Sequence, residues 1–260
     1  MSIAARAKLN LSLDVLGRRE DGYHELRMVM QAAELADEVY VELRESGFFL
    51  AETNRHYIPS GEKNEAVKAA RAFFAAAGLD HGAYIKIEKR IPVCAGLGGG
   101  SADAAAVLRA LNSLCGRPFT ADGLREIAAL VGSDVPFCVE GGTALVEGRG
   151  ERIEPLRPLP DTGAVICMPF FSCSTPELFT RLDALRTRCR PDTDGLVAAL
   201  RAGGLAGVAR RMYNVFEDAL DRRCAQAVGE IKRLLLENGA LGAVMSGSGS
   251  AGYGLFADEE

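Results

Sequence analysis

The stretch PVCAGLGGGSADAA, residues 92–105, contains the residue types that hold phosphate groups in proteins. Four glycines fall within residues 96–100, and an alanine-rich segment that we predict to be a helix begins at Ser101. Glycines let backbone N–H groups converge on an anion, and the start of a helix directs its positive end to the same point. A plain tight turn is the alternative, but so many glycines are entropically unfavourable for a turn alone. We therefore expect a phosphate-binding loop.

The loop matches neither of the common nucleotide-binding patterns. The pattern G-x-x-x-x-G-K-[ST] requires a lysine after the glycines, and none follows them here. The dinucleotide pattern G-x-G-x-x-G also fails, because Ser101 occupies the position of its third glycine. The positive charge that a phosphate group needs must therefore come from elsewhere.

Three further stretches carry polar groups that are suited to chemistry, although each has an ordinary structural interpretation. Lys8 and Asn10 alternate with leucines in a predicted strand and could simply face solvent. Asp134, in GSDVPF, could be a helix N-cap. The stretch SGSGSAG, residues 246–252, could be the turn of a hairpin. Taken singly, these residues favour the structural interpretations.

Composition excludes several classes of protein. The chain has 260 residues, of which 48% are hydrophobic and 25% charged, as expected for a soluble globular protein of one or two domains. A net charge of −5 disfavours a nucleic-acid binder. No apolar run approaches the roughly 20 residues of a membrane span, and the N-terminus lacks the apolar core of a signal or transit peptide, so we expect a bacterial cytoplasmic protein. The seven cysteines and three histidines lack metal-ligand spacing, so buried thiols are expected.

Periodicity predicts a mixture of helices and strands in two domains. Helices are predicted at 64–78, 101–114 and 120–132, with Gly78 as a C-cap and Thr120 as an N-cap. Residues 132–137 are expected to be a break, followed by the strand at 143–147. Strands are predicted at 7–14, 27–34, 38–44, 84–90, 143–147 and 163–168. A helix from Thr175, further helices between 193 and 238, and two strands flanking 246–252 complete the prediction. The proline-rich segment 150–160 suggests a boundary between domains 1–152 and 153–260.

Taken together, and in this order, the motifs resemble those of the GHMP kinases, a superfamily of small-molecule kinases. The matching stretches are AKLNL, PVCAGLGGGSADAA, GSDVPF and SGSGSAG. GRREDGYHEL after the first motif, the triple glycine before Ser101 and Asp134-Val-Pro narrow the resemblance to the branch that phosphorylates 4-diphosphocytidyl-2-C-methyl-D-erythritol in the non-mevalonate isoprenoid pathway. The resemblance covers essentially the whole chain.

The resemblance implies an α+β fold with two domains and an active site in the cleft between them. The N-terminal domain would be ribosomal-protein-S5-like and would bind ATP, and the C-terminal domain would be a ferredoxin-like α/β plait. The enzyme would transfer the γ-phosphate of ATP to the 2-hydroxyl of the methylerythritol moiety. It would need neither nucleic acid nor membrane, and a monomer or weak homodimer is expected.

The resemblance also implies roles for individual residues. Asp134 would be the general base, and Lys8 would lie beside it. Mg²⁺ would neutralise the ATP phosphates, although no further acidic residue stands out as its ligand. The ATP-binding residues would be Asn64, near the adenine, and Pro92, Val93, Cys94, Ala95, Gly96, Leu97, Gly98, Gly99, Gly100, Ser101 and Ala102. The substrate-binding residues would be Asn10, Tyr23, His24, Thr175, Phe179, Gly247, Ser248 and Gly249, with aromatic faces sandwiching the cytosine and His24 reading its polar edge.

Two departures from the family pattern and three alternatives accompany this hypothesis. Ala102 stands where the family usually has a second serine, and the chain ends four residues after Phe256, where the family usually continues. A related kinase acting on homoserine, mevalonate or a sugar is one alternative. A catalytically inactive nucleotide-binding protein is another, although Lys8 and Asp134 are both present. An RNA-binding module is disfavoured by the acidic charge.

Overall fold

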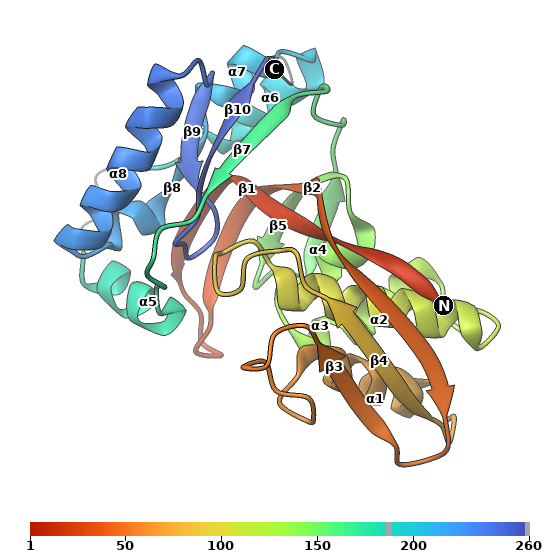
Figure 1. Ribbon diagram of the computed structural model, residues 1–260. Helices are drawn as coiled ribbons and strands as arrows, with labels where there is room; N and C mark the ends of the chain where they lie inside the picture. Colours follow the sequence, from red (N-terminus) through yellow and green to blue (C-terminus); the bar gives the residue numbers. More distant parts are fainter. Residues whose placement is uncertain (186–188, 258–260) are drawn as a thin grey trace. The chain divides into compact units, whose positions relative to one another are not determined.

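The computed structural model describes residues 1–185 and 189–257 (Figure 1). The chain divides into two compact units, and each contains segments that are distant in the sequence. The prediction that the chain is shorter than its family concerns its C-terminal end, and residues 258–260 there lie outside the described residues. Unit 1 comprises Met1–Lys8, Ala32–Val93 and Gly98–Gly141, and unit 2 comprises Leu9–Gln31, Cys94–Leu97 and Gly142–Glu260.

The two longest strands, β1 (Ser2–Arg18) and β2 (His24–Arg44), contribute residues to both units. β2 is continuous, so the prediction of two separate strands at 27–34 and 38–44 is wrong. In β1 both faces are buried: Lys8 is 4% exposed and Asn10 is fully buried. The interpretation of these two residues as a solvated face is therefore also wrong.

Unit 1 places helices beside a sheet in which β3 (Phe49–Thr53) runs parallel to β4 (Gly82–Glu88) and β4 runs antiparallel to β2. Helix α1 (Glu65–Ala77) packs against α2 (Gly99–Leu114) and α3 (Ala121–Val131). The predicted caps are confirmed: Gly78 is left-handed with φ 63°, and Thr120 accepts a hydrogen bond from Gly123 N. Where a break was predicted, helix α4 (Val135–Glu140) forms, because a proline is tolerated in the first turn of a helix.

Unit 2 contains a three-stranded antiparallel sheet in the order β7 (Gly163–Cys167), β10 (Gly252–Phe256), β9 (Gly242–Met245). Helix α8 (Arg222–Glu237) packs against this sheet (Figure 1). The predicted hairpin is confirmed, because residues 246–251 connect β9 to β10. The remaining elements are β5 (Thr143–Gly148), β6 (Arg152–Pro155), α5 (Thr175–Ala184), α6 (Thr193–Ala202), α7 (Leu205–Ala209), β8 (Tyr213–Asn214) and the 3₁₀-helix η1 (Val215–Ala219).

Within the described residues, no helix combines the length and the apolar character that crossing a membrane requires.

Candidate active site

The glycine loop leads directly into α2, which begins at Gly99, two residues before its predicted start. Gly98 is the N-cap, has φ +68° and makes no side-chain capping hydrogen bond. A Cβ atom at Gly98 would lie 2.7 Å from Cγ of Lys8. Glycine at this position therefore permits both the left-handed turn and the close passage of the lysine side chain.

Lys8 and Asp134 form an ion pair in unit 1, as the resemblance implied. Lys8 Nζ lies 3.3 Å from Asp134 Oδ2, and their side chains are 5% and 30% exposed. Asp134 occupies the N-cap position of α4, but its side chain makes no capping hydrogen bond. Capping of α4 therefore does not explain why an aspartate side chain stands at this position. The pair places a carboxylate, a group that can act as a general base, beside an ammonium group.

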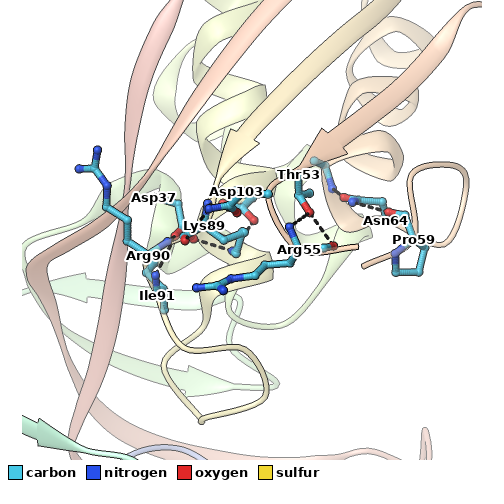
Figure 2. A network of polar contacts seen from close by, with 11 residues as sticks. Asp37, Thr53, Arg55, Pro59, Asn64, Lys89, Arg90, Ile91 and Asp103 are labelled. Carbon is cyan, nitrogen blue, oxygen red and sulfur yellow. Dashed lines mark hydrogen bonds and ion pairs between the residues drawn. The ribbon is translucent and has the colours of Figure 1, made fainter. Parts of the chain in front are cut away.

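A buried charge cluster lies next to the start of α2 (Figure 2). Lys89 Nζ lies 2.5 Å from Asp37 Oδ2 and 2.6 Å from Asp103 Oδ2. The side chains of all three residues are at most 7% exposed. Burial raises the pKa of Asp103 to about 7, although the nearby Lys89 acts in the opposite direction. Burial lowers the pKa of Lys89, but its two carboxylate partners raise it above the ordinary value.

The cluster holds the chain on both sides of the glycine loop. Asp37 Oδ1 accepts hydrogen bonds from the backbone N–H groups of Arg90 and Ile91, the second at 2.8 Å (Figure 2). These amides stand immediately before Pro92, whereas Asp103 belongs to the second turn of α2. Lys89 links the two carboxylates, so the cluster fixes the strand that enters the loop to the helix that leaves it.

Asn64, expected near the adenine, is the N-cap of α1. Its Oδ1 accepts a hydrogen bond from Ala66 N at 2.9 Å, and its Nδ2 donates to Pro59 O at 2.7 Å (Figure 2). Both ends of the amide are therefore used within unit 1. A contact of Asn64 with adenine stays a prediction.

The second glycine loop is fixed by hydrogen bonds within unit 2. Asn214 Nδ2 donates to the carbonyl groups of Met245 and Gly247, at 2.8 and 2.7 Å. Ser246 Oγ donates to Gly96 O at 3.1 Å, and a Cβ atom at Gly96 would lie only 2.0 Å from Ser246 O. Residues 94–97 of the first glycine loop therefore pack closely on the second glycine loop, and a side chain at Gly96 would push the two loops apart.

The residues expected at the substrate also lie in unit 2. His24 stacks on Phe179 with ring centroids 4.3 Å apart, and its Nε2 lies 2.9 Å from Asp183 Oδ1. Tyr23 is 54% exposed, and the guanidinium group of Arg149 lies over its ring. The structure therefore brings His24 and Phe179 into direct contact, which the sequence did not indicate.

Two further contacts connect predicted substrate residues in unit 2. The hydroxyl groups of Thr175 and Ser248 lie 2.7 Å apart. Asn10 N donates to Ser246 Oγ at 3.3 Å, and Asn10 O accepts from Tyr253 Oη at 2.9 Å. The backbone of Asn10 is thereby linked to the second glycine loop and to β10.

The structure thus divides the predicted site residues into two sets. Unit 1 holds Lys8, Asn64, Pro92, Val93, Gly98, Gly99, Gly100, Ser101, Ala102 and Asp134, and unit 2 holds Asn10, Tyr23, His24, Cys94, Ala95, Gly96, Leu97, Thr175, Phe179, Gly247, Ser248 and Gly249. Within the described ranges, no group of three or more histidine, cysteine or carboxylate side chains could hold a metal ion.

Sequence reasoning missed four charged residues beside the loop. They are Asp37, Glu65, Lys89 and Asp103. One signal was available, because Asp103 is the sole charged residue in an otherwise alanine-rich run, where a buried carboxylate requires a partner.

Comparisons with known proteins agree with the motifs. The family profile described as "GHMP kinases N terminal domain" matches residues 64–142, and "GHMP kinases C terminal" matches residues 196–260. A 4-diphosphocytidyl-2-C-methyl-D-erythritol kinase from Pelotomaculum thermopropionicum is 45% identical over 98% of this chain and 89% of its own length. The enzyme of that name from Alkaliphilus metalliredigens is 42% identical over 98% of this chain and 88% of its own.

Solved structures show the same relationship. A crystal structure of 4-(cytidine 5'-diphospho)-2C-methyl-D-erythritol kinase is 37% identical, with a TM-score of 0.79 over 98% of this chain and 90% of that chain. A homoserine kinase from Cytophaga hutchinsonii shares the fold at 22% identity, with a TM-score of 0.77 over 99% of this chain and 85% of that one. With both family domains in order and close relatives along nearly its whole length, the chain belongs to the GHMP kinases, within their family of 4-diphosphocytidyl-2-C-methyl-D-erythritol kinases, and is an ATP-dependent small-molecule kinase.

Proposed function

We propose that Asp134 is the general base that removes the proton from the 2-hydroxyl of 4-diphosphocytidyl-2-C-methyl-D-erythritol. The observation that carries this proposal is the ion pair between Asp134 and Lys8, at 3.3 Å. The acceptor oxygen forms a bond to the γ-phosphorus of ATP while the bond to the β,γ-bridging oxygen breaks, and ADP leaves. The hydroxyl proton passes to the Asp134 carboxylate, and the Lys8 ammonium stabilises the charge that develops beside it.

The backbone of residues 92–102 and the start of α2 are proposed to bind the ATP phosphates. α2 starts at a glycine N-cap without a side-chain capping hydrogen bond, and the positive end of a long helix favours an anion at that point. The adenine would lie near Asn64. Positioning and electrostatic stabilisation supply most of the catalysis in phosphoryl transfer, so a rigid loop suits this reaction.

Mg²⁺ is the proposed cofactor, and the available donors fit it. Mg²⁺ is typically bound by one or two carboxylates together with substrate phosphates, rather than by a cage made entirely of protein. The Glu65 carboxylate and the Ser101 hydroxyl lie beside the first turn of α2 and are donors of this kind. When bound, the metal would neutralise charge on the phosphates.

The remaining substrate residues are proposed to bind the cytidine and erythritol parts. Tyr23, His24 and Phe179 would bind the cytosine, and their aromatic surface supports this role because a flat base stacks on aromatic rings. The erythritol and diphosphate parts would contact Asn10, Thr175 and residues 247–249. We also propose that ATP binding belongs to residues 1–152, that residues 153–260 form the second domain, and that the enzyme acts in the bacterial cytoplasm.

Substitution of Asp134 by asparagine tests the proposed base. Asparagine keeps the shape but cannot accept the proton, so kcat should fall about 10²- to 10⁴-fold while the Kd for MgATP stays within about twofold. Asp122→Asn, at an exposed position in the first turn of α3, provides a matched control and should retain full activity. A near-normal kcat in a folded Asp134→Asn variant would show that another group takes the proton.

A kinase with a different acceptor is the second candidate, because homoserine and mevalonate kinases share this fold. A coupled assay of ADP release with a panel of alcohols decides between them. Preferential turnover of homoserine or mevalonate would contradict the cytidyl substrate. The stacked His24–Phe179 pair favours an acceptor that carries a flat base.

A further inference from the structure

Glu65 places a carboxylate at the first turn of α2. It is the first residue of α1, directly after the N-cap Asn64. A Cβ atom at Gly100 would lie 2.8 Å from Glu65 Oε2, so the carboxylate closely approaches the backbone of that glycine. The Ser101 hydroxyl lies near enough to the same carboxylate to act against the rise in its pKa. Glu65 therefore contacts two residues of the proposed phosphate-binding turn.

The charges around this turn do not favour a bare triphosphate. Two lysines approach it, Lys8 at Gly98 and Lys89 at Gly99. Lys8 is paired with Asp134, and Lys89 is shared between Asp37 and Asp103. Both ammonium groups are therefore already balanced by carboxylates, before Glu65 adds a further negative charge.

Glu65 lies in a partly buried environment that contains charges of both signs. Burial is the main cause that raises the pKa of Glu65, and repulsion from Asp134 raises it further. Lys68, Lys89 and the Ser101 hydroxyl act in the opposite direction, and the pKa stays above its ordinary value. An anion brought to Gly100 and Ser101 would be repelled by this carboxylate, unless a cation arrived with it.

We propose that Glu65 is a specificity-determining residue, which makes the nucleotide site select ATP carrying a divalent cation over metal-free ATP. This inference rests on the proposed location of the phosphates at α2. Repulsion by Glu65 weakens the binding of the metal-free nucleotide. With the cation present, the same carboxylate faces a positive charge and the repulsion becomes an attraction.

The test compares two dissociation constants measured by isothermal titration calorimetry on the full chain. One is measured for ATP in excess EDTA and the other for ATP in excess MgCl₂, and their ratio measures selectivity for the metal-bound nucleotide. Glu65→Gln removes the charge and keeps the shape, so the ratio should fall on the order of tenfold, mainly through tighter binding of metal-free ATP. Glu65→Asp keeps the charge and should retain most of the selectivity.

The matched control is Glu62→Gln, which removes the same charge from an exposed side chain three residues away. This control should leave the ratio unchanged. An unchanged ratio in folded Glu65→Gln, or an equal fall in Glu62→Gln, would overturn the role of Glu65 alone. Failure of the unsubstituted chain to bind MgATP would overturn the proposed phosphate site as well. If Glu65→Gln does not fold, a loss of selectivity in folded Glu65→Asp would refute the charge-based argument.

Discussion

Replacement of Lys89 by methionine should destabilise the protein more than any exposed lysine substitution. Methionine has a similar length but no charge, so the change leaves Asp37 and Asp103 without their shared cation. The side chain of Asp37 is fully buried and that of Asp103 is 7% exposed. Removing one partner of a buried ion pair typically costs 3 to 5 kcal/mol of unfolding free energy.

Two features of the cluster place the expected loss near the lower end of that range. Asp37 retains its hydrogen bonds from the backbone of Arg90 and Ile91. Asp103, whose pKa is already raised to about 7, can take up a proton once Lys89 is gone. We therefore expect a loss of about 3 kcal/mol, or a fall in Tm of about 6 to 12 °C for a chain of this length.

Urea unfolding followed by circular dichroism measures this loss, with Lys86→Met as a control on an exposed position of β4. The cost of Lys89→Met should shrink by about 1 to 3 kcal/mol when Asp103 has first been changed to asparagine, because the two sites are coupled. A loss below about 1 kcal/mol, or equal losses in both backgrounds, would refute the argument that the ion pairs hold the cluster together.

The remaining predictions concern the same turn. Gly98→Ala should cost about 1 to 3 kcal/mol for its left-handed φ and should also lower kcat by displacing Lys8. Gly116 has φ +79° and open space around it, so Gly116→Ala should lose similar stability but keep its kcat. Equal kcat values in Gly98→Ala and Gly116→Ala would contradict the steric argument. As the pH increases from 5 to 8, the unfolding free energy of Asp103→Asn should rise by about 2 kcal/mol relative to that of the unsubstituted chain. The folded-state pKa of Asp103 is raised, so the unsubstituted chain loses stability as the pH rises towards 7. Parallel pH profiles of unfolding free energy in the two proteins would show that Asp103 does not titrate in this range.

Local patterns predicted the elements whose determinants are local. The N-cap Thr120 and the C-cap Gly78 lie within the helices' own sequence signals, and both are confirmed. Helix α4 was missed because Val-Pro-Phe was interpreted as a break, although a proline near the start of a helix removes no intrahelical hydrogen bond. The division of β2 was wrong because a locally weak strand pattern can be extended by pairing with distant strands, here β4 and β5.

The candidate site could be predicted only as far as motif resemblance reaches. Alternation in β1 identified Lys8 and Asn10 as facing the same way, but burial of both faces depends on contacts that the strand itself does not encode. Ser12 illustrates this, because it is fully buried and its hydroxyl accepts a hydrogen bond from Val29 N in β2. Lys89 directly follows β4 and Glu65 begins α1, which are ordinary positions for charged residues, and their roles depend on partners brought to them by the fold.

The absence of a lysine from the glycine loop can now be given a physical interpretation. Lysines do reach the turn, but they come from β1 and from the residue after β4, and each arrives with carboxylates that balance its charge. Such pairs hold the backbone in place and leave little net positive charge for a triphosphate. A loop built in this way orients the phosphates through backbone amides and relies on the cation carried by the nucleotide for neutralisation. If Glu65 makes binding depend on that cation, the loop lacks a lysine because the metal supplies the positive charge that a lysine would supply. Removing the Glu65 carboxylate should then weaken the requirement for the metal.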